Sequence, residues 1–181
     1  MNGVILAIDQ GTTSSTALVF TEDGSIIGTS SNEIRQSYPK PGWVEQDPDE
    51  IWNVSLSVMC QAILNANCSP AQVKAIGISN QRETTLVWDR ATGLPIHPAI
   101  VWQSRQSSAI CERLRSDGFE ALTRAKTGLV IDPYFSAPKI LRLFDRYPDL
   151  HQLAKDGKVI LDTIDSCLLW NLTGGLEDAT D

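Results

Sequence analysis

The segment at residues 9–14 combines a carboxylate, a glycine and three hydroxyls, and could bind phosphate. Gly11 would let the main chain approach an anion, and successive N–H groups could form a concave nest around phosphate oxygens. Asp9 could hold Mg²⁺ directly or through water. The hydroxyls come from Thr12, Thr13 and Ser14. The segment has neither the Walker spacing nor the dinucleotide-binding fingerprint. Because Asp, Gly and Thr are common in turns, an ordinary hairpin turn is the alternative interpretation.

A second group of residues could bind a small polyol. Arg82 and Glu83 follow an apolar run, and a guanidinium can donate to hydroxyls while a carboxylate accepts from them. Trp102 could supply an apolar wall, and Tyr134 a phenolic hydroxyl. The alternative is a surface ion pair, which contributes roughly 0–1 kcal/mol, beside two aromatic residues of the core.

The elements that would position the first group are β-strands. The apolar run at residues 4–8 predicts a strand buried on both faces, and residues 15–20 predict a second one. Asp23-Gly24 is typical of a tight hairpin turn leading to a third strand near residues 26–27. We therefore expect three antiparallel strands at the start of the chain, with the glycine-threonine turn after the first.

A helix is predicted after the proline-containing loop at residues 36–48. Asp47 is the expected N-cap, Pro48 suits the first helical position, and Glu50 stands where a capping box places its acid. Apolar residues at helical spacing predict the buried stripe. They are Trp52, Leu56, Met59, Ile63 and Ala66.

The remaining chain alternates between strand-like and helix-like patterns, which is typical of an α/β protein. Strands are predicted at residues 75–78 (an inner strand), 84–88 and 99–102, with a turn at 89–93. A long polar helix is predicted at residues 107–126. Ser136 and Thr163 are expected to cap two later helices, the second of which ends at Gly174-Gly175.

Composition narrows the classes of function. The chain has 181 residues, enough for one domain or part of a larger protein, with 15 Lys and Arg against 22 Asp and Glu. This acidity argues against nucleic acid and anionic membranes as partners. The four cysteines form no C-x-x-C pair, which favours reduced thiols in a cytoplasmic protein. Two histidines exclude a histidine-rich metal site, and the first apolar run is too short for a signal peptide or a membrane span.

Taken together, these segments resemble the FGGY family of carbohydrate kinases. The similarity is collinear from about residue 4 to residue 181, which makes it more specific than any single motif. The matching blocks are AIDQGTTSS (7–15), YPKPGWVE (38–45), IGISNQRETT (76–85), AIVWQ (99–103) and TGLVIDPYFS (127–136). The Asn-Gln-Arg-Glu-Thr segment resembles the members that act on glycerol, since pentulose kinases usually carry a Gly-Gln-x-His-like segment there.

The resemblance implies an actin-like, ribonuclease H-like ATPase fold, and an intact enzyme that uses ATP to phosphorylate glycerol to sn-glycerol 3-phosphate. Thr12, Thr13, Ser14 and Gly11 would then contact ATP phosphates and Asp9 would hold Mg²⁺. Arg82, Glu83, Tyr134 and Trp102 would bind glycerol. The family usually has arginine at the position of Thr16, so the nucleotide-phosphate contact there is expected to differ.

The resemblance also implies that residues 1–181 are the N-terminal domain of such a kinase and are incomplete. The general base and the C-terminal ATPase domain that holds adenosine would lie downstream, and the isolated chain is expected to be inactive. We expect the full-length enzyme to be a cytoplasmic homo-oligomer.

Three other functions are open on sequence grounds. The first is a kinase of the same family acting on another polyol or a ketopentose. The second is a non-catalytic, actin-like nucleotide-binding module, against which the Arg82–Glu83 pair and Tyr134 argue. The third is an interaction or oligomerisation unit.

Overall fold

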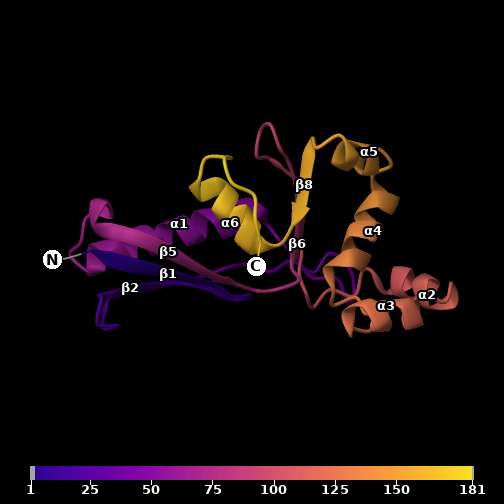
Figure 1. Ribbon diagram of the computed structural model, residues 1–181, viewed down its shortest axis with the longest axis horizontal. Helices are drawn as coiled ribbons and strands as arrows, with labels where there is room; N and C mark the ends of the chain where they lie inside the picture. The colour runs from indigo at the N-terminus through magenta and orange to yellow at the C-terminus, as the bar shows by residue number, and fades with distance from the viewer. Residues whose placement is uncertain (1–2, 181) are drawn as a thin grey trace. The chain divides into compact units, whose positions relative to one another are not determined.

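The computed structural model describes residues 3–180 and divides the chain into two compact units (Figure 1). Unit 1 contains the described residues up to Gln36 together with Gln46–Gln81. Unit 2 contains Ser37–Glu45 and the described residues from Arg82 onward. Runs of strands are followed by helices along the chain, and the protein is of the expected α/β class.

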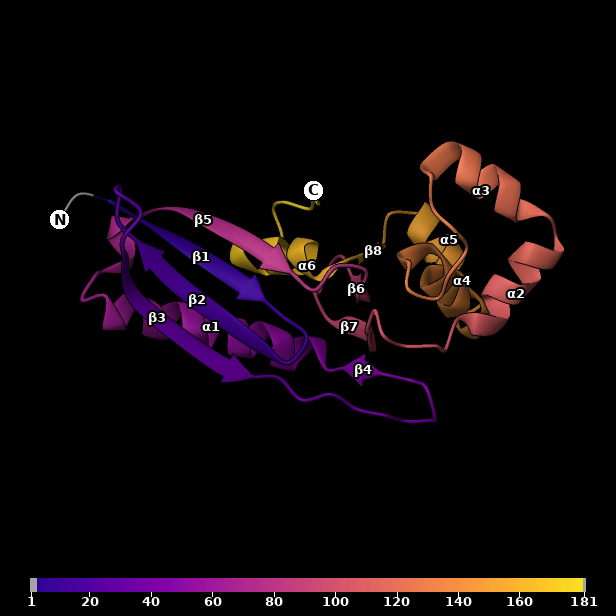
Figure 2. The same ribbon diagram turned by 90° about the horizontal axis from the view of Figure 1, so that it is seen from below.

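Unit 1 is built on a four-stranded sheet with the order β3-β2-β1-β5 (Figure 2). Its strands are β1 (Val4–Gln10), β2 (Ser14–Phe20), β3 (Ile26–Glu33) and β5 (Val73–Asn80). β1 is antiparallel to β2 and parallel to β5, and β2 is antiparallel to β3. The predicted three-stranded opening is confirmed. Gly24 has φ 83° and donates its N–H to the carbonyl of Thr21 at 3.0 Å, which closes the predicted turn.

The strands of unit 1 are less buried than the apolar runs predicted. Val4, Leu6 and Ile8 are buried, but Ile5, which points to the other face, is 46% exposed. β5 lies at the edge of the sheet, and Ile76 on it is 44% exposed. The predictions of a first strand buried on both faces and of an inner strand at residues 75–78 were therefore wrong. The reason is that helix α1 covers one face of this sheet and contacts β1, β2 and β3, so only that face is covered by a helix of unit 1 (Figure 2).

Helix α1 (Pro48–Asn65) begins as predicted. Asp47 is its N-cap and accepts a hydrogen bond from the N–H of Asp49 at 3.0 Å. Glu50 does not complete the predicted capping box. Its carboxylate accepts instead from Nε of Arg35 at 3.0 Å, because the chain leaving β3 passes beside the first turn of the helix.

The buried stripe of α1 is displaced from the predicted one. Leu56 is 39% exposed, whereas the buried residues are Pro48, Ile51, Ser55, Val58, Met59 and Ala62. Of the predicted stripe, Met59 and Ala66 are buried, and the helix approaches β3 closely at Gly28. A Cβ atom added to Gly28 would lie 2.4 Å from the carbonyl oxygen of Ala62, so the helix can pack at this depth only against a glycine.

A second four-stranded sheet has the order β4-β7-β6-β8. Its strands are β4 (Glu45–Gln46), β6 (Thr85–Asp89), β7 (Pro95–Ile100) and β8 (Val159–Asp162). β6 is antiparallel to both β7 and β8. The predicted turn after β6 is confirmed, since Asp89 Oδ1 accepts from the N–H groups of Ala91 and Thr92. The strand predicted at 99–102 instead ends at Ile100, and Trp102 lies in a turn.

Helices cover the second sheet and extend beyond it. They are α2 (Ser108–Ser116), α3 (Phe119–Thr127), α4 (Ser136–Arg146), α5 (Leu150–Lys155) and α6 (Ile164–Leu172). A hydrophobic cluster joins α4 and α5 to the sheet. Its buried members are Val87, Ile100, Leu143, Leu150 and Val159. A short 3₁₀ helix (Pro70–Gln72) precedes β5 in unit 1. Among the described residues, no helix combines the length and apolarity needed to cross a membrane.

Two helix predictions in unit 2 are corrected. The single helix expected at 107–126 is two helices, because Gly118 adopts φ 81° between α2 and α3. Ser136 is the first residue of α4 rather than its cap, which is Phe135. Thr163 occupies the predicted N-cap position of α6, and Gly174 follows that helix with φ 65°, as expected.

Candidate functional site

The predicted site residues fall into two groups, one in each unit. The phosphate group lies in unit 1 and contains Asp9, Gly11, Thr12, Thr13, Ser14 and Thr16. The polyol group lies in unit 2 and contains Arg82, Glu83, Trp102 and Tyr134.

The turn at residues 11–14 connects β1 to β2. The N–H of Gly11 donates to the carbonyl of Ser14 at 2.8 Å, so this N–H serves to close the turn. A Cβ atom on residue 11 would lie 3.1 Å from that same carbonyl oxygen, which is tighter than ordinary van der Waals contact. Glycine is therefore used here for a close approach of backbone to backbone.

Three buried glutamines, which the sequence analysis missed, hold this turn from inside the protein. Nε2 of Gln46 donates to the carbonyl of Thr12 at 2.8 Å, and Nε2 of Gln81 lies 3.3 Å from the carbonyl of Gly11. Gln81 also donates to Oε1 of Gln46 at 2.8 Å and contacts Oε1 of Gln10 at 3.3 Å. Neutral amides of this kind give no charge signal in a sequence, and only their burial reveals them.

The glutamine network determines which way the backbone of the turn is directed. In a trans peptide the N–H lies opposite to the C=O that precedes it. Because the carbonyls of Gly11 and Thr12 are held by glutamines, the N–H groups of Thr12 and Thr13 are directed to the opposite side. Thr13 is exposed and Thr12 is half-buried.

Asp9 stands at the carboxyl end of β1 with its side chain exposed. It is directly opposite Thr16 on β2, whose hydroxyl is 2.8 Å from the hydroxyl of Ser31 on β3. In residues 3–180 no group of three or more His, Cys, Asp or Glu could hold a metal ion. One exposed carboxylate beside hydroxyls does fit Mg²⁺, which proteins commonly hold through one or two carboxylates, waters and substrate phosphates.

In unit 2, two hydrogen bonds hold the side chain of Glu83 at the N-terminus of helix α4. Its carboxylate Oε2 accepts from both the N–H and the hydroxyl of Ser136, each at 2.7 Å. This places a negative charge at the helix N-terminus, where the helix dipole stabilises it. Glu83 has φ 65°, a conformation that costs a non-glycine residue energy and persists when its surroundings hold it. Arg82, in the same turn, is exposed.

Tyr134 lies beside the same helix terminus and is surrounded by aromatic rings. The ring of Trp102 is 5.9 Å away at an interplanar angle of 72°, and the ring of Phe135 is 5.1 Å away. The N–H of Tyr134 donates to Oδ1 of Asp132 at 2.9 Å. Trp102 in turn donates its N–H to the hydroxyl of the buried Thr84 at 3.2 Å. Thus Glu83, Trp102 and Tyr134 converge at the start of α4.

Lys139, on the first turns of α4, is a second kind of residue that the sequence analysis missed. It is 0% exposed, and its Nζ donates to the carbonyls of Tyr134 and Phe135. Burial lowers the pKa of the Lys139 ammonium from 10.5 to about 8, although the neighbouring Glu83 and Asp132 carboxylates act in the other direction. A lysine five residues after Tyr134 gives no sign in the sequence that it turns inward.

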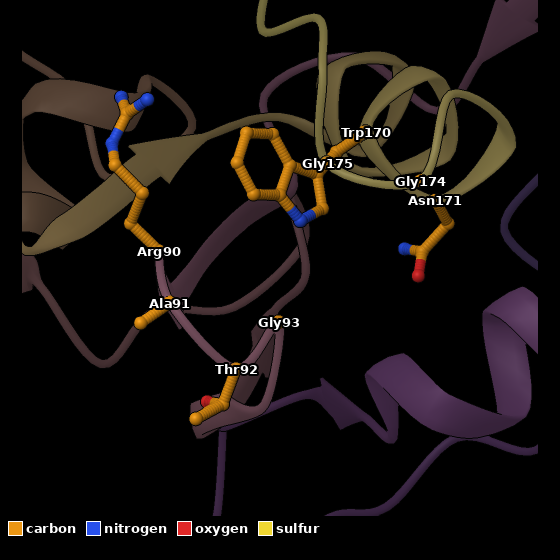
Figure 3. A pocket seen from close by; sticks show the side chains of 8 residues that line it. All are labelled: Arg90, Ala91, Thr92, Gly93, Trp170, Asn171, Gly174 and Gly175. Atoms are coloured by element: carbon orange, nitrogen blue, oxygen red, sulfur yellow. The ribbon is translucent and has the colours of Figure 1, made fainter.

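A cavity of about 330 Å³ in unit 2 lies away from the predicted polyol group. Arg90 and Thr92 line it from the turn after β6, and Trp170 and Asn171 from the end of α6 (Figure 3). The Arg90 guanidinium is 5.7 Å from the Trp170 ring and 3.1 Å from Asp178. None of the residues predicted for phosphate or polyol binding lines this cavity.

The chain is similar to curated glycerol kinases along nearly its whole length. It is 53% identical to the glycerol kinase of Thermus brockianus and 55% identical to that of Trichlorobacter lovleyi, in each case over 98% of this chain. It is 49% identical to the glycerol kinase of a Geobacillus strain over 100% of this chain. The chain spans 36% of the length of each of these relatives.

The chain is also similar in fold to solved structures of carbohydrate kinases. The Plasmodium falciparum glycerol kinase crystallised with ADP is 36% identical, with a TM-score of 0.90 over 96% of this chain and 35% of that one. A xyloylose kinase from Brucella ovis is 25% identical, with a TM-score of 0.78 over 92% of this chain and 33% of that one. The expected actin-like, ribonuclease H-like fold is thereby confirmed.

A family model described as the N-terminal domain of the FGGY family of carbohydrate kinases matches residues 4–181. The match includes both the turn after β1 and the residues gathered at the start of α4. The chain belongs to the FGGY family of carbohydrate kinases.

Proposed function

We propose that this chain is the N-terminal part of an ATP-dependent glycerol kinase. The intact enzyme would transfer the γ-phosphoryl group of ATP to a terminal hydroxyl of glycerol, giving sn-glycerol 3-phosphate and ADP. Two findings support this: the relatives named glycerol kinase at 49–55% identity, and the group of polar and aromatic side chains at the start of α4.

The observation that carries the proposal is the geometry around Glu83. Its Oε2 atom accepts two hydrogen bonds from Ser136, so the other carboxylate oxygen can accept a hydrogen bond from a hydroxyl group, while Arg82 next to it can donate. The Tyr134 and Trp102 rings supply the apolar wall and a phenolic hydroxyl at the same place. A charged pair beside such a wall suits a small polyol.

For the nucleotide, we propose that the turn after β1 contacts phosphate oxygens. The side of the turn opposite the glutamines carries the N–H groups of Thr12 and Thr13, with the hydroxyl of Ser14 next in sequence. Asp9 would hold Mg²⁺, which neutralises charge on the phosphates when it is bound. The solved Plasmodium falciparum glycerol kinase with ADP supports nucleotide binding in the family.

We further propose that residues 1–181 are an incomplete N-terminal domain of the enzyme. The general base and the part that holds adenosine would belong to other segments of the full-length protein. The relatives' greater length supports this. A cytoplasmic location is supported by the four cysteines, which carry free thiols in the part of the chain that the structure describes. We also propose a homo-oligomer for the intact enzyme, with neither nucleic acid nor a membrane as partner.

The experiment that tests this function is phosphorylation by the full-length enzyme with Mg-ATP and a panel of acceptors. We expect glycerol to be used with the highest kcat/KM. The solved xyloylose kinase supports one rival, a kinase for another polyol or a ketopentose, so xylulose and ribulose belong in the panel. A higher kcat/KM for either ketopentose would replace glycerol as the proposed substrate. ATP binding without transfer to any acceptor would favour a non-catalytic module.

A further inference from the structure

Lys139 is an unusual residue for the interior of a protein. Its side chain is 0% exposed, and fully buried lysines are rare because an ammonium loses its hydration on burial. A methionine of similar length would fill the same space without this cost. The position therefore carries a charge that packing alone does not require.

The ammonium group of Lys139 binds the backbone of the proposed polyol site. Nζ of Lys139 donates to the carbonyls of Tyr134 and Phe135, the last of these at 3.2 Å, and lies 6.0 Å from the centre of the Tyr134 ring. These two carbonyls belong to the residues immediately before α4, which starts at Ser136. The ammonium thus ties the segment that carries the Tyr134 ring to the helix.

The same helix terminus also holds Glu83. Its carboxylate accepts two hydrogen bonds from Ser136, so the backbone that Lys139 fixes on one side is the backbone that orients Glu83 on the other. Glu83 is also an electrostatic partner of Lys139, together with Asp132 before the helix and Cys111 on α2. A displacement of residues 134–136 would therefore move both side chains together.

We propose that Lys139 is a positioning residue of the polyol site, whose buried ammonium sets the segment 134–136 and through it the places of Tyr134 and Glu83. This inference rests on the proposed glycerol kinase function. It assigns no direct substrate contact to Lys139. Its consequence is that the loss of the ammonium weakens the binding of the polyol more than that of the nucleotide.

The test is steady-state kinetics of the full-length enzyme with Lys139→Met, which keeps the length of the side chain and removes its three donors. The matched control is Lys155→Met, the same substitution at an exposed lysine on α5. For Lys139→Met we expect the KM for glycerol to rise at least about tenfold with the KM for ATP within about twofold of wild type. Lys155→Met should change neither.

The outcomes separate this inference from the proposed function. A wild-type enzyme that does not phosphorylate glycerol would contradict both the proposed function and the positioning role of Lys139. An active wild type combined with an unchanged glycerol KM in Lys139→Met would overturn only the positioning role. Equal rises in the two KM values would also overturn it, because they would indicate general damage to the fold.

If Lys139→Met does not yield folded protein, the wild type itself supplies the test. The pKa of Lys139 is about 8, and burial raises the pKa of the Cys111 thiol above its usual value, which keeps that neighbour protonated at the start of the window. We expect the KM for glycerol to rise severalfold between pH 7 and pH 9 while the KM for ATP stays constant. A glycerol KM that does not change with pH would overturn the proposal.

Discussion

The turn after β1 and the cluster at the start of α4 are held in place by opposite means. The turn is fixed by neutral groups, in which buried amides of Gln46 and Gln81 hold backbone carbonyls. The cluster is fixed by charges, with the Glu83 carboxylate and the Lys139 ammonium bound on either side of one helix terminus. Both arrangements direct the backbone, but only the second uses ionisable side chains.

This difference agrees with the ligands proposed for the two regions. A phosphate carries its own charge, and backbone N–H groups on a neutral support can bind it. Glycerol is neutral and small, so its recognition depends on charged donors and acceptors placed accurately around it. We therefore expect substitutions in unit 2 to affect glycerol and substitutions in the turn to affect nucleotide.

The largest effect is expected on the turnover rate when the chain 1–181 is assayed without the rest of the enzyme. The isolated chain 1–181 contains both regions but spans 36% of its relatives' length, and we expect it to fold at least partly and to show no turnover. Transfer needs acceptor, γ-phosphate, metal and base aligned in one cleft, and the loss of one part typically costs about 100-fold or more. A coupled assay of ADP release should find less than about a thousandth of the full-length rate. Glycerol-dependent turnover above that level, with contamination excluded, would show that the chain is sufficient.

The second prediction concerns Arg82→Ala in the full-length enzyme. The substitution removes the donors of the proposed polyol site beside Glu83, which typically costs a few kcal/mol in a desolvated site. Isothermal titration should show glycerol binding weakened by about two to three orders of magnitude, with Mg-ATP binding retained. Arg90→Ala removes an exposed arginine of the same unit and should leave glycerol binding as it was. If Arg82→Ala binds glycerol with wild-type affinity, the Arg82–Glu83 pair is a surface ion pair and not part of the glycerol site.

The third prediction separates the charged region from the neutral one by pH. The pKa of Lys139 in the folded protein is about 8, below the 10.5 of an exposed lysine, so between these values the unfolded chain binds more protons. The free energy of unfolding attributable to Lys139 should then rise by about 3 kcal/mol from pH 8 to pH 10.5. The measurement is denaturant unfolding of the isolated chain across this range.

The control for that prediction is Lys139→Met, whose unfolding free energy should lack this rise. Lys155→Met, at an exposed site, should retain it. If the two variants show the same dependence on pH, the buried ammonium is not its source.

The smallest effect is expected at the phosphate side. Thr16 stands directly opposite Asp9, and Thr16→Arg would place a guanidinium on the same sheet face as the proposed phosphate and metal residues. A charge-assisted hydrogen bond at the lower end of its usual range would tighten ADP or ATP binding about tenfold in the full-length enzyme. Glycerol affinity should not change. Unchanged or weaker nucleotide binding would indicate that the arginine pairs with Asp9 instead.

Local signals in the sequence were sufficient for much of the fold. The three opening strands, the Asp47 cap, the turn after Asp89 and the Gly174-Gly175 helix end all depend on residues close together in the chain. The two groups of candidate residues were also visible, because Asp-x-Gly-Thr and Arg-Glu are chemically distinctive. Their roles in binding stay predictions.

Local patterns are therefore enough to assign the kind of element at most positions and to recognise the chemical groups available for binding. The packing of segments distant in sequence decides which faces are buried, as Ile5, Leu56 and the edge strand β5 show. It also decides that Glu50 pairs with Arg35, that Glu83 binds Ser136, and that Lys139 turns inward. The physical reason is that burial and long-range pairing depend on which segments pack together, and a glutamine or lysine has the same local pattern whether it is buried or exposed.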